Sequence, residues 1–96
     1  MVKTFAQLKR DLQEGVKVKT IYNYCKPERN GEVRNVAKKQ TNAIAFLTSE
    51  GKESFLWWPK TASLVEYEDN TFKIYDEPSQ WNDNQRTLVF VYEILG

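Results

Sequence analysis

The sequence predicts an α+β domain in which an N-terminal helix precedes a strongly bent antiparallel sheet, closed into a small SH3-like barrel of about six strands. Helical spacing of apolar residues is convincing only between residues 4 and 14. From residue 16 onward the spacing changes to the period of two that is typical of strands. The segments at 54–60 and 87–95 are apolar in both phases, as expected of central strands in a closed barrel.

The helix has a capping-box signal at its start, because Thr4 is followed three residues later by Gln7. Its apolar stripe is formed by Phe5, Leu8 and Leu12. Gly15 is expected to end the helix. A single short stripe is marginal on its own, so we expect this helix to lie on the sheet.

The first predicted strand covers residues 16–24. Its core-facing phase is predicted to contain Val16, Val18, Tyr22 and Tyr24, and its outward phase Lys17 and Lys19. A turn-rich loop at 25–31 follows, and then strands at 32–40 and 43–48. An OB-fold is the alternative, but its helix usually lies between the third and fourth strands, where this sequence has no helical pattern.

The second half begins with a hairpin loop at 49–52 that leads into the apolar strand at 54–60. A second hairpin joins 64–68 to 72–75 through Asp69 and Asn70. Residues 76–85 are polar and are predicted to form an ordered loop that Trp81 pins to the body of the domain. The closing strand covers 87–95.

Length and composition bound the class of protein. Ninety-six residues fit one domain, 1–96, with one core, and a hydrophobic content of 41% lies outside the range of disordered chains. No apolar run approaches the roughly 20 residues that cross a bilayer, and the N-terminus has no signal-peptide pattern. We therefore expect a cytoplasmic protein without a membrane partner, as a monomer or small homo-oligomer.

The residue types needed for common chemistry are scarce. Cys25 is the only cysteine and there is no histidine, which excludes an internal disulfide, a Cys/His zinc site and every Ser-His or Cys-His pair. The remaining candidates are a carboxylate group at Glu66, Glu68 and Asp69, which could hold Mg²⁺, and a nuclease-like E-x-K triplet at residues 50–52. Both patterns are common on solvated surfaces, so we expect no enzyme activity, no metal and no cofactor.

Charge is unevenly distributed. Residues 1–45 contain ten Lys/Arg against four Asp/Glu, whereas residues 46–96 contain four against nine. A nucleic-acid interface would rest on Lys17, Lys19, Lys26, Arg29, Arg34, Lys38 and Lys39. Aromatic rings beside these cations are not expected, because Tyr22 and Tyr24 are predicted to face the core. Any nucleic-acid binding should therefore be weak.

Alternation along the 54–60 strand places Phe55 and Trp57 on one face and Leu56 and Trp58 on the other. We expect one small core to enclose only one of these sets and the outward set to contact a partner. The alternative is that both tryptophans are ordinary core or rim residues. We predict that Trp58 faces outward, because Pro59 ends the strand beside it. The predicted protein-binding site is Trp58 with Lys60 and Trp81.

Three segments, at 34–42, 55–60 and 70–75, resemble small uncharacterised proteins carried by phages and conjugative elements of Gram-positive bacteria. The resemblance covers the middle two thirds of the chain, and no functional residue is carried over from it. It implies a non-catalytic protein that binds host or phage machinery, a class that includes inhibitors of defence systems such as anti-CRISPR proteins. Direct nucleic-acid binding through the basic first half is the alternative.

Overall fold

The computed structural model describes residues 2–48 and 50–96, which form mostly antiparallel sheet with one short α-helix. Met1 and Ser49, the first residue of the predicted 49–52 loop, lie outside the described residues. The elements are β1 (Val2–Lys3), α1 (Phe5–Asp11), β2 (Lys17–Asn23), the 3₁₀ turn η1 (Pro27–Arg29), β3 (Val33–Lys39), β4 (Ala43–Leu47), β5 (Glu53–Trp57), η2 (Ala62–Leu64), β6 (Val65–Glu68), β7 (Thr71–Ser79), η3 (Gln80–Asn82) and β8 (Gln85–Ile94).

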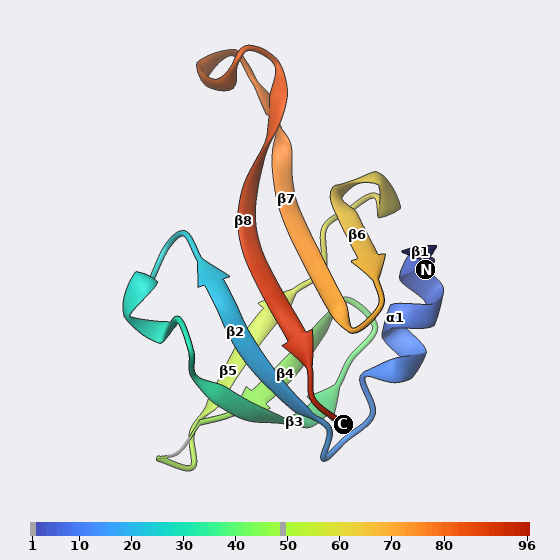
Figure 1. Ribbon diagram of the computed structural model, residues 1–96, viewed down its shortest axis with the longest axis vertical. Coiled ribbons are helices and arrows are strands. Elements are labelled where there is room, and N and C mark those ends of the chain that lie inside the picture. The colour runs from blue at the N-terminus through green and yellow to red at the C-terminus, as the bar shows by residue number, and fades with distance from the viewer. Residues whose placement is uncertain (1, 49) are drawn as a thin grey trace.

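The strands form one sheet in the order β1-β6-β7-β8-β2-β3-β4-β5, and each pair of neighbours is antiparallel. The sheet is strongly bent, and β7 and β8 rise beyond its other strands as a long ribbon (Figure 1). The helix α1 lies beside β1 and β6, at the end of the sheet that these strands form (Figure 1).

The predicted closed SH3-like barrel of about six strands is wrong, because the sheet has eight strands and remains open. Closure would require the two end strands of this order, β1 and β5, to pair with each other. Among the described residues, β1 pairs with β6 alone and β5 with β4 alone, so each is left as an edge of the sheet.

The N-terminal helix is present but shorter than predicted. Thr4 is its N-cap and accepts a 3.1 Å hydrogen bond from the backbone N–H of Gln7, as the capping box predicted. The helical segment ends at Asp11, and Leu12 leaves helical geometry with ψ of 68°. Leu8 and Leu12 are both fully buried, so the helix is anchored to the sheet through its predicted apolar stripe.

A bulge in β2 changes which side chains face the core. Thr20 is opposite Tyr92 on β8, but Tyr22 is opposite Val91, so the register shifts between Thr20 and Tyr22. As a result Asn23 is buried and Tyr24 is exposed. The prediction that Tyr22 and Tyr24 both face the core is wrong, since an extra residue in one strand reverses the alternation after it.

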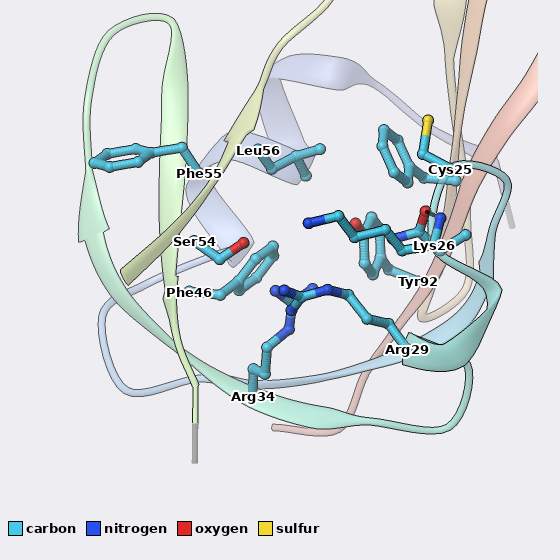
Figure 2. Close-up of a pocket in the computed structure, with 11 residues that line it drawn as sticks. Cys25, Lys26, Arg29, Arg34, Phe46, Ser54, Phe55, Leu56 and Tyr92 are labelled. Atoms are coloured by element: carbon cyan, nitrogen blue, oxygen red, sulfur yellow. Dashed lines mark hydrogen bonds between the residues drawn. The ribbon is translucent and has the colours of Figure 1, made fainter. Parts of the chain in front are cut away.

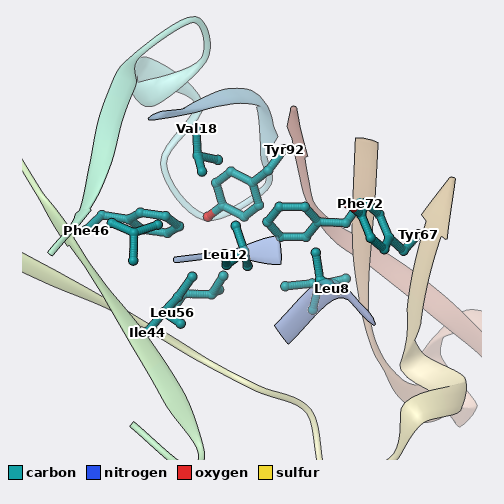
Figure 3. Close-up of a cluster of buried hydrophobic side chains, with 11 residues drawn as sticks. Leu8, Leu12, Val18, Ile44, Phe46, Leu56, Tyr67, Phe72 and Tyr92 are labelled. Atoms are coloured by element: carbon teal, nitrogen blue, oxygen red, sulfur yellow. The ribbon is translucent and has the colours of Figure 1, made fainter. Parts of the chain in front are cut away.

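The core fills the concave side of the bent sheet. It combines α1 with side chains from seven of the strands, and Phe46, Tyr92 and Phe72 form a chain of rings through its centre (Figure 3). The buried members are Leu8, Leu12, Val18, Val36, Ile44, Phe46, Leu56, Tyr67, Phe72, Ile74 and Tyr92. This core holds the inward face of β5 in place.

The polar segment at 76–85 differs from the predicted loop. Residues up to Ser79 continue β7, and β8 begins at Gln85, so the two strands run together to the end of the ribbon. The short turn η3 closes it, followed by Asp83 and Asn84 with φ of 53° and 58°. Trp81 is 89% exposed at this tip, so it does not pin the segment to the body of the domain.

Candidate functional site

The outward aromatic side chains of β5 are the opposite set to the one predicted. Leu56 is 4% exposed and lies opposite Ile44 in the core, whereas Phe55 is 44% and Trp57 65% exposed. The rings of Phe55 and Trp57 stack with centroids 6.0 Å apart and an interplanar angle of 26°. They form an exposed aromatic pair, while Trp58 follows the inward phase of Leu56.

Trp58 is half-buried and packs against the core. Its ring meets that of Phe5 on the helix edge-on, with centroids 5.3 Å apart, and lies 6.4 Å from the ring of Phe72. The prediction that Trp58 faces outward is therefore wrong. Although Pro59 follows the strand, the ring continues inward because the helix offers it an aromatic surface.

The backbone of β5 has one paired edge and one open edge. The N–H of Trp58 bonds to the carbonyl of Asn42, and the N–H of Thr48 to the carbonyl of Lys52, each at 2.8 Å. Hydrogen-bonded pairs alternate along an antiparallel ladder, so the intervening β5 residues direct their backbone groups away from β4. Those residues are Glu53, Phe55 and Trp57. Within residues 2–48 and 50–96, no strand pairs with this open edge.

A cleft of about 410 Å³ lies between the end of β5 and the ribbon of β7 and β8. Trp57, Trp58 and Lys60 line its β5 side. Its other lining residues are Cys25, Pro59, Leu64, Ile74, Tyr75, Asp76, Glu77, Val89 and Phe90.

The three residues of the predicted protein-binding site are not all brought together. Trp58 and Lys60 border the same cleft, and Lys60 is exposed. Trp81 lies in η3, the turn that joins β7 to β8, and is absent from the cleft lining. Phe55 and Trp57, which the prediction assigned to the core, are exposed on the strand with the open edge, and Trp57 lines the cleft with Lys60.

The seven predicted nucleic-acid-binding cations do not share one face. Lys17 and Lys19 lie on the outer face of β2, while Arg34 lies opposite Val18 in the inward phase and is 5% exposed. The prediction that Arg34 joins Lys17 and Lys19 in a basic strip on one exposed face is therefore wrong. Lys39 is on β3 and its Nζ donates a 2.6 Å hydrogen bond to the carbonyl of Lys9.

The bulge in β2 nevertheless gives the outer face an aromatic component. Tyr22 is half-buried and Tyr24 is 62% exposed, and both follow Lys17 and Lys19 on that face. Alternation alone placed the two tyrosine rings on the opposite side. The outer face of β2 thus combines the cations with aromatic rings, although the alternation predicted them on opposite faces.

Three of the cations, Lys26, Arg29 and Arg34, line a separate pocket of about 160 Å³, which we call the basic pocket (Figure 2). Its other lining residues are Asn23, Cys25, Phe46, Ser54, Phe55, Leu56, Phe90 and Tyr92. Asn23 orders the loop at its mouth, because its Oδ1 accepts a 2.9 Å hydrogen bond from the N–H of Lys26. Burial raises the pKa of the Tyr92 phenol, although the charge of Arg34 opposes that rise, so the hydroxyl stays protonated at neutral pH.

The acidic candidates are engaged in surface contacts. Glu66 accepts hydrogen bonds of 3.0 Å from Arg86 and from the phenol of Tyr75, and the Arg86 contact is the main reason that the pKa of Glu66 is lowered. Glu68 and Asp69 line the same shallow hollow as Glu66. Over the described residues, no group of three His, Cys, Asp or Glu side chains is arranged to hold a metal ion.

The second acidic candidate, the E-x-K triplet, places its two charged side chains against each other. The Nζ of Lys52 lies 3.8 Å from Oε2 of Glu50, and both side chains are more than three-quarters exposed. This is the arrangement of a solvated surface ion pair.

Comparisons with protein-family models, curated proteins and solved structures found no match to this chain. In the part of the chain that the structure describes, no helix is long and apolar enough to cross a membrane. The candidate sites are therefore defined by geometry: the open edge of β5 with its aromatic pair and cleft, the outer face of β2, and the basic pocket.

Proposed function

We propose that this chain is a non-catalytic protein-binding module that captures an extended segment of a partner protein on the open edge of β5. The observation that carries the proposal is the coincidence of unpaired backbone groups and exposed aromatic rings on the same residues, Phe55 and Trp57. Added strands obtain affinity from backbone hydrogen bonds and specificity from pockets for alternate side chains.

The chemistry of the partner segment follows from the two faces of β5. One set of its alternate side chains would cover the stacked rings of Phe55 and Trp57, and the other would enter the cleft beside Trp58. Both surfaces favour apolar or aromatic residues, with Lys60 available for a polar contact at the rim. A long aromatic edge strand is otherwise a hazard for aggregation, and natural proteins usually cover or charge such edges.

The resemblance to phage and conjugative-element proteins supports a host or phage protein as the partner, including nucleic-acid-handling or defence proteins of the kind that anti-CRISPR inhibitors block. Blocking requires no catalytic group on this chain. Its action would consist of occupying a surface that the partner needs.

The proposal is tested by selecting extended peptides from a displayed random library and mapping their contact by amide hydrogen exchange. We expect selected peptides to be apolar at alternate positions and to protect the amides of Glu53, Phe55 and Trp57. Glu53→Pro removes an outward N–H without using the β4 ladder, so it should abolish binding, whereas the matched Glu53→Gln should bind normally. Peptides that protect amides elsewhere, or that bind Glu53→Pro as well as Glu53→Gln, would refute strand addition.

A second candidate function, direct nucleic-acid binding, is favoured by one specific observation. The outer face of β2 presents Tyr24 and the half-buried Tyr22 along with Lys17 and Lys19. Cations that track a backbone beside rings that stack on bases are the combination used by single-strand binders. Glu93 lies opposite Lys19 on β8, which reduces the positive potential there and supports weak binding.

A further inference from the structure

The basic pocket lies beside the docking edge, and its three cations have no part in the strand-docking proposal. It lies where η1, β3, β5 and β8 meet, and the side chains of Lys26, Arg29 and Arg34 converge in it from two segments of the chain (Figure 2). The hydroxyl of Ser54 faces the same space from β5 (Figure 2). The pocket therefore gathers several hydrogen-bond donors at one end of the sheet.

Arg34 is held rigidly at the base of the pocket. Its side chain is 4% exposed, and its guanidinium carbon lies 4.6 Å from the centre of the Phe46 ring. One terminal nitrogen makes a long 3.4 Å hydrogen bond to Oγ1 of the buried Thr20. A charged group this deeply buried is normally hydrogen-bonded through every donor, because unpaired charge in a low dielectric is costly.

The Nε of Arg34 departs from that rule. It is buried without a hydrogen-bond partner, although it lies 3.2 Å from Oε1 of Glu32. The distance allows an ion pair, but the N–H is not directed at the carboxylate oxygen. The same Oε1 also lies 3.3 Å from a terminal nitrogen of Arg29, so one oxygen serves two guanidinium groups.

Charge in and around the pocket is unbalanced. Lys26, Arg29 and Arg34 carry three positive charges. Among the residues that the structure describes, Glu32 is the one carboxylate that forms an ion pair with them, which leaves an excess of two. Other glutamates border a neighbouring, open hollow that Lys26 and Arg29 also line: Glu28, Glu50 and Glu53. These three are exposed, as Lys26 is, and they offset part of the positive charge on the side of Lys26 and Arg29 that faces this hollow. None of them lines the basic pocket itself.

The size of the pocket limits what it can hold. A volume of about 160 Å³ exceeds the roughly 30 Å³ share of one water molecule in the liquid, but is well below the roughly 300 Å³ at which pockets for drug-sized ligands begin. It therefore admits a small anion and excludes a nucleoside. Arginine forks match the oxygen geometry of phosphate and carboxylate, and the excess of two charges favours a dianion over a carboxylate or a phosphodiester, each of which carries a single charge.

We propose that the basic pocket binds a phosphate dianion, either inorganic phosphate or the phosphate of a monoester, through Lys26, Arg29 and Arg34. The inference stands independently of strand addition at β5. An anion in the pocket takes over part of the interaction that Glu32 makes with Arg29 and Arg34. It contacts the terminal nitrogens of the guanidinium groups, because the Nε of Arg34 is buried even when the pocket is empty.

The direct test is isothermal titration calorimetry of the whole chain with inorganic phosphate, methyl phosphate and dimethyl phosphate. The titrations are made at pH 8, where inorganic phosphate and methyl phosphate are dianionic, and at constant ionic strength. We expect inorganic phosphate or methyl phosphate to bind at least tenfold more tightly than dimethyl phosphate. If methyl phosphate is the tighter of the two, the natural ligand is a monoester; if inorganic phosphate is tighter, it is the free ion.

Variants separate the pocket from general surface charge. Lys26→Ala and Arg29→Ala should each weaken phosphate binding about tenfold or more, whereas Lys52→Ala, at an exposed lysine outside the pocket, should leave it unchanged. Glu32→Gln should tighten binding, because it removes the carboxylate that competes for both guanidinium groups. If the cluster had only a structural role, Glu32→Gln would lower the stability of the protein and would not tighten phosphate binding.

Arg34→Gln removes the buried donor, and circular dichroism shows whether the variant is folded. If folded, it should lose phosphate binding; if unfolded, the Lys26, Arg29 and Glu32 variants still decide the question. The proposal is overturned if phosphate does not bind at millimolar concentration, if Lys26→Ala and Arg29→Ala bind like Lys52→Ala, or if dimethyl phosphate binds as tightly as the monoester. The last result would point to a nucleic-acid backbone as the ligand.

Discussion

The phenol of Tyr67 on β6 donates a 2.7 Å hydrogen bond to Oδ2 of Asp11 at the end of α1. This bond is the main reason that the pKa of Asp11 lies below its ordinary value of 3.8, with a second contribution from Gln7, which donates to Oδ1. Burial, followed by the same carboxylate, raises the pKa of Tyr67 to about 12. The pair joins the short helix to the sheet at the point where helical geometry stops.

Tyr67→Phe should therefore reduce the free energy of unfolding at pH 7 by about 1 kcal/mol, below the roughly 1.5–3 kcal/mol typical of bonds to charged groups because Asp11 is partly exposed. The depressed pKa of Asp11 gives stability that is complete above the ordinary value of 3.8 and is lost as pH falls through the lower folded value. The difference between wild type and Tyr67→Phe should shrink over that range. Urea unfolding from pH 7 to pH 2 measures it.

The matched control is Tyr75→Phe, whose phenol donates a 3.0 Å hydrogen bond to Glu66 at an exposed position. Solvent competes for that bond, so we expect a loss below about 0.5 kcal/mol. An equal loss in both variants, or a Tyr67→Phe effect that does not depend on pH, would show that the bond to ionised Asp11 is not what stabilises the helix.

The start of the helix could be predicted from the sequence, because a capping box is a local signal. Thr4 and Gln7 make the expected bond without help from the rest of the chain. The bulge at Thr20 to Tyr22 could not, since it arises where two distant strands meet and has no marker in the alternation. For the same reason, the exposure of Tyr24 that follows from the bulge could not be predicted either.

The open sheet also depends on pairing that alternation does not specify. Period-two patterns identify strands but not their neighbours, and both faces of the 54–60 segment contain bulky residues, so the pattern fitted a closed barrel and either orientation of β5. The helix decides the orientation, because Phe5 offers a surface that Trp58 can cover. For the basic pocket, the sequence showed only that Lys and Arg are concentrated in the first half of the chain. It gave no reason to expect that Arg34 would be buried while the other cations are not.

The two neighbouring tryptophans should respond differently to truncation. Trp58→Ala removes a half-buried ring between Phe5 and Phe72 and should cost about 2–3 kcal/mol, somewhat less than the roughly 3–5 kcal/mol of a fully buried ring. Trp57→Ala, at 65% exposure, should change stability by less than about 0.5 kcal/mol. Thermal and urea melts of the two variants provide the comparison.

Binding should show the reverse order if β5 is the docking edge. Trp57→Ala should weaken a selected extended peptide by about 2 kcal/mol or more, as truncation of an aromatic anchor does. Calorimetric titration of the folded variant measures the change. A Trp57→Ala variant that binds normally would remove the aromatic pair from the proposed interface, even if strand addition itself were retained.

The outer face of β2 makes a separate prediction about nucleic acid. If single-stranded oligonucleotides bind there, replacing Lys17 or Lys19 by Ala should reduce the salt dependence of log K against log salt by about 0.7 per lost phosphate contact. Tyr24→Ala should cost about 1–3 kcal/mol if its ring stacks on a base. Mobility-shift titrations at several salt concentrations measure both, with Lys52→Ala as the control from the acidic half. Unchanged slopes in the lysine variants would exclude this face.

Trp81 provides the sharpest test of where a protein partner contacts this chain. Its ring is 89% exposed at the tip of the ribbon, and the turn beneath it is set by the left-handed residues Asp83 and Asn84 rather than by the ring. Trp81→Ala should therefore leave the free energy of unfolding within about 0.5 kcal/mol of wild type. Because Trp81 does not line the cleft beside β5, the affinity for a β5-docking peptide should also be unchanged. If calorimetry instead shows a loss equal to that of Trp57→Ala, the partner must reach from the open edge of β5 to the ribbon tip, and the contact is larger than one added strand.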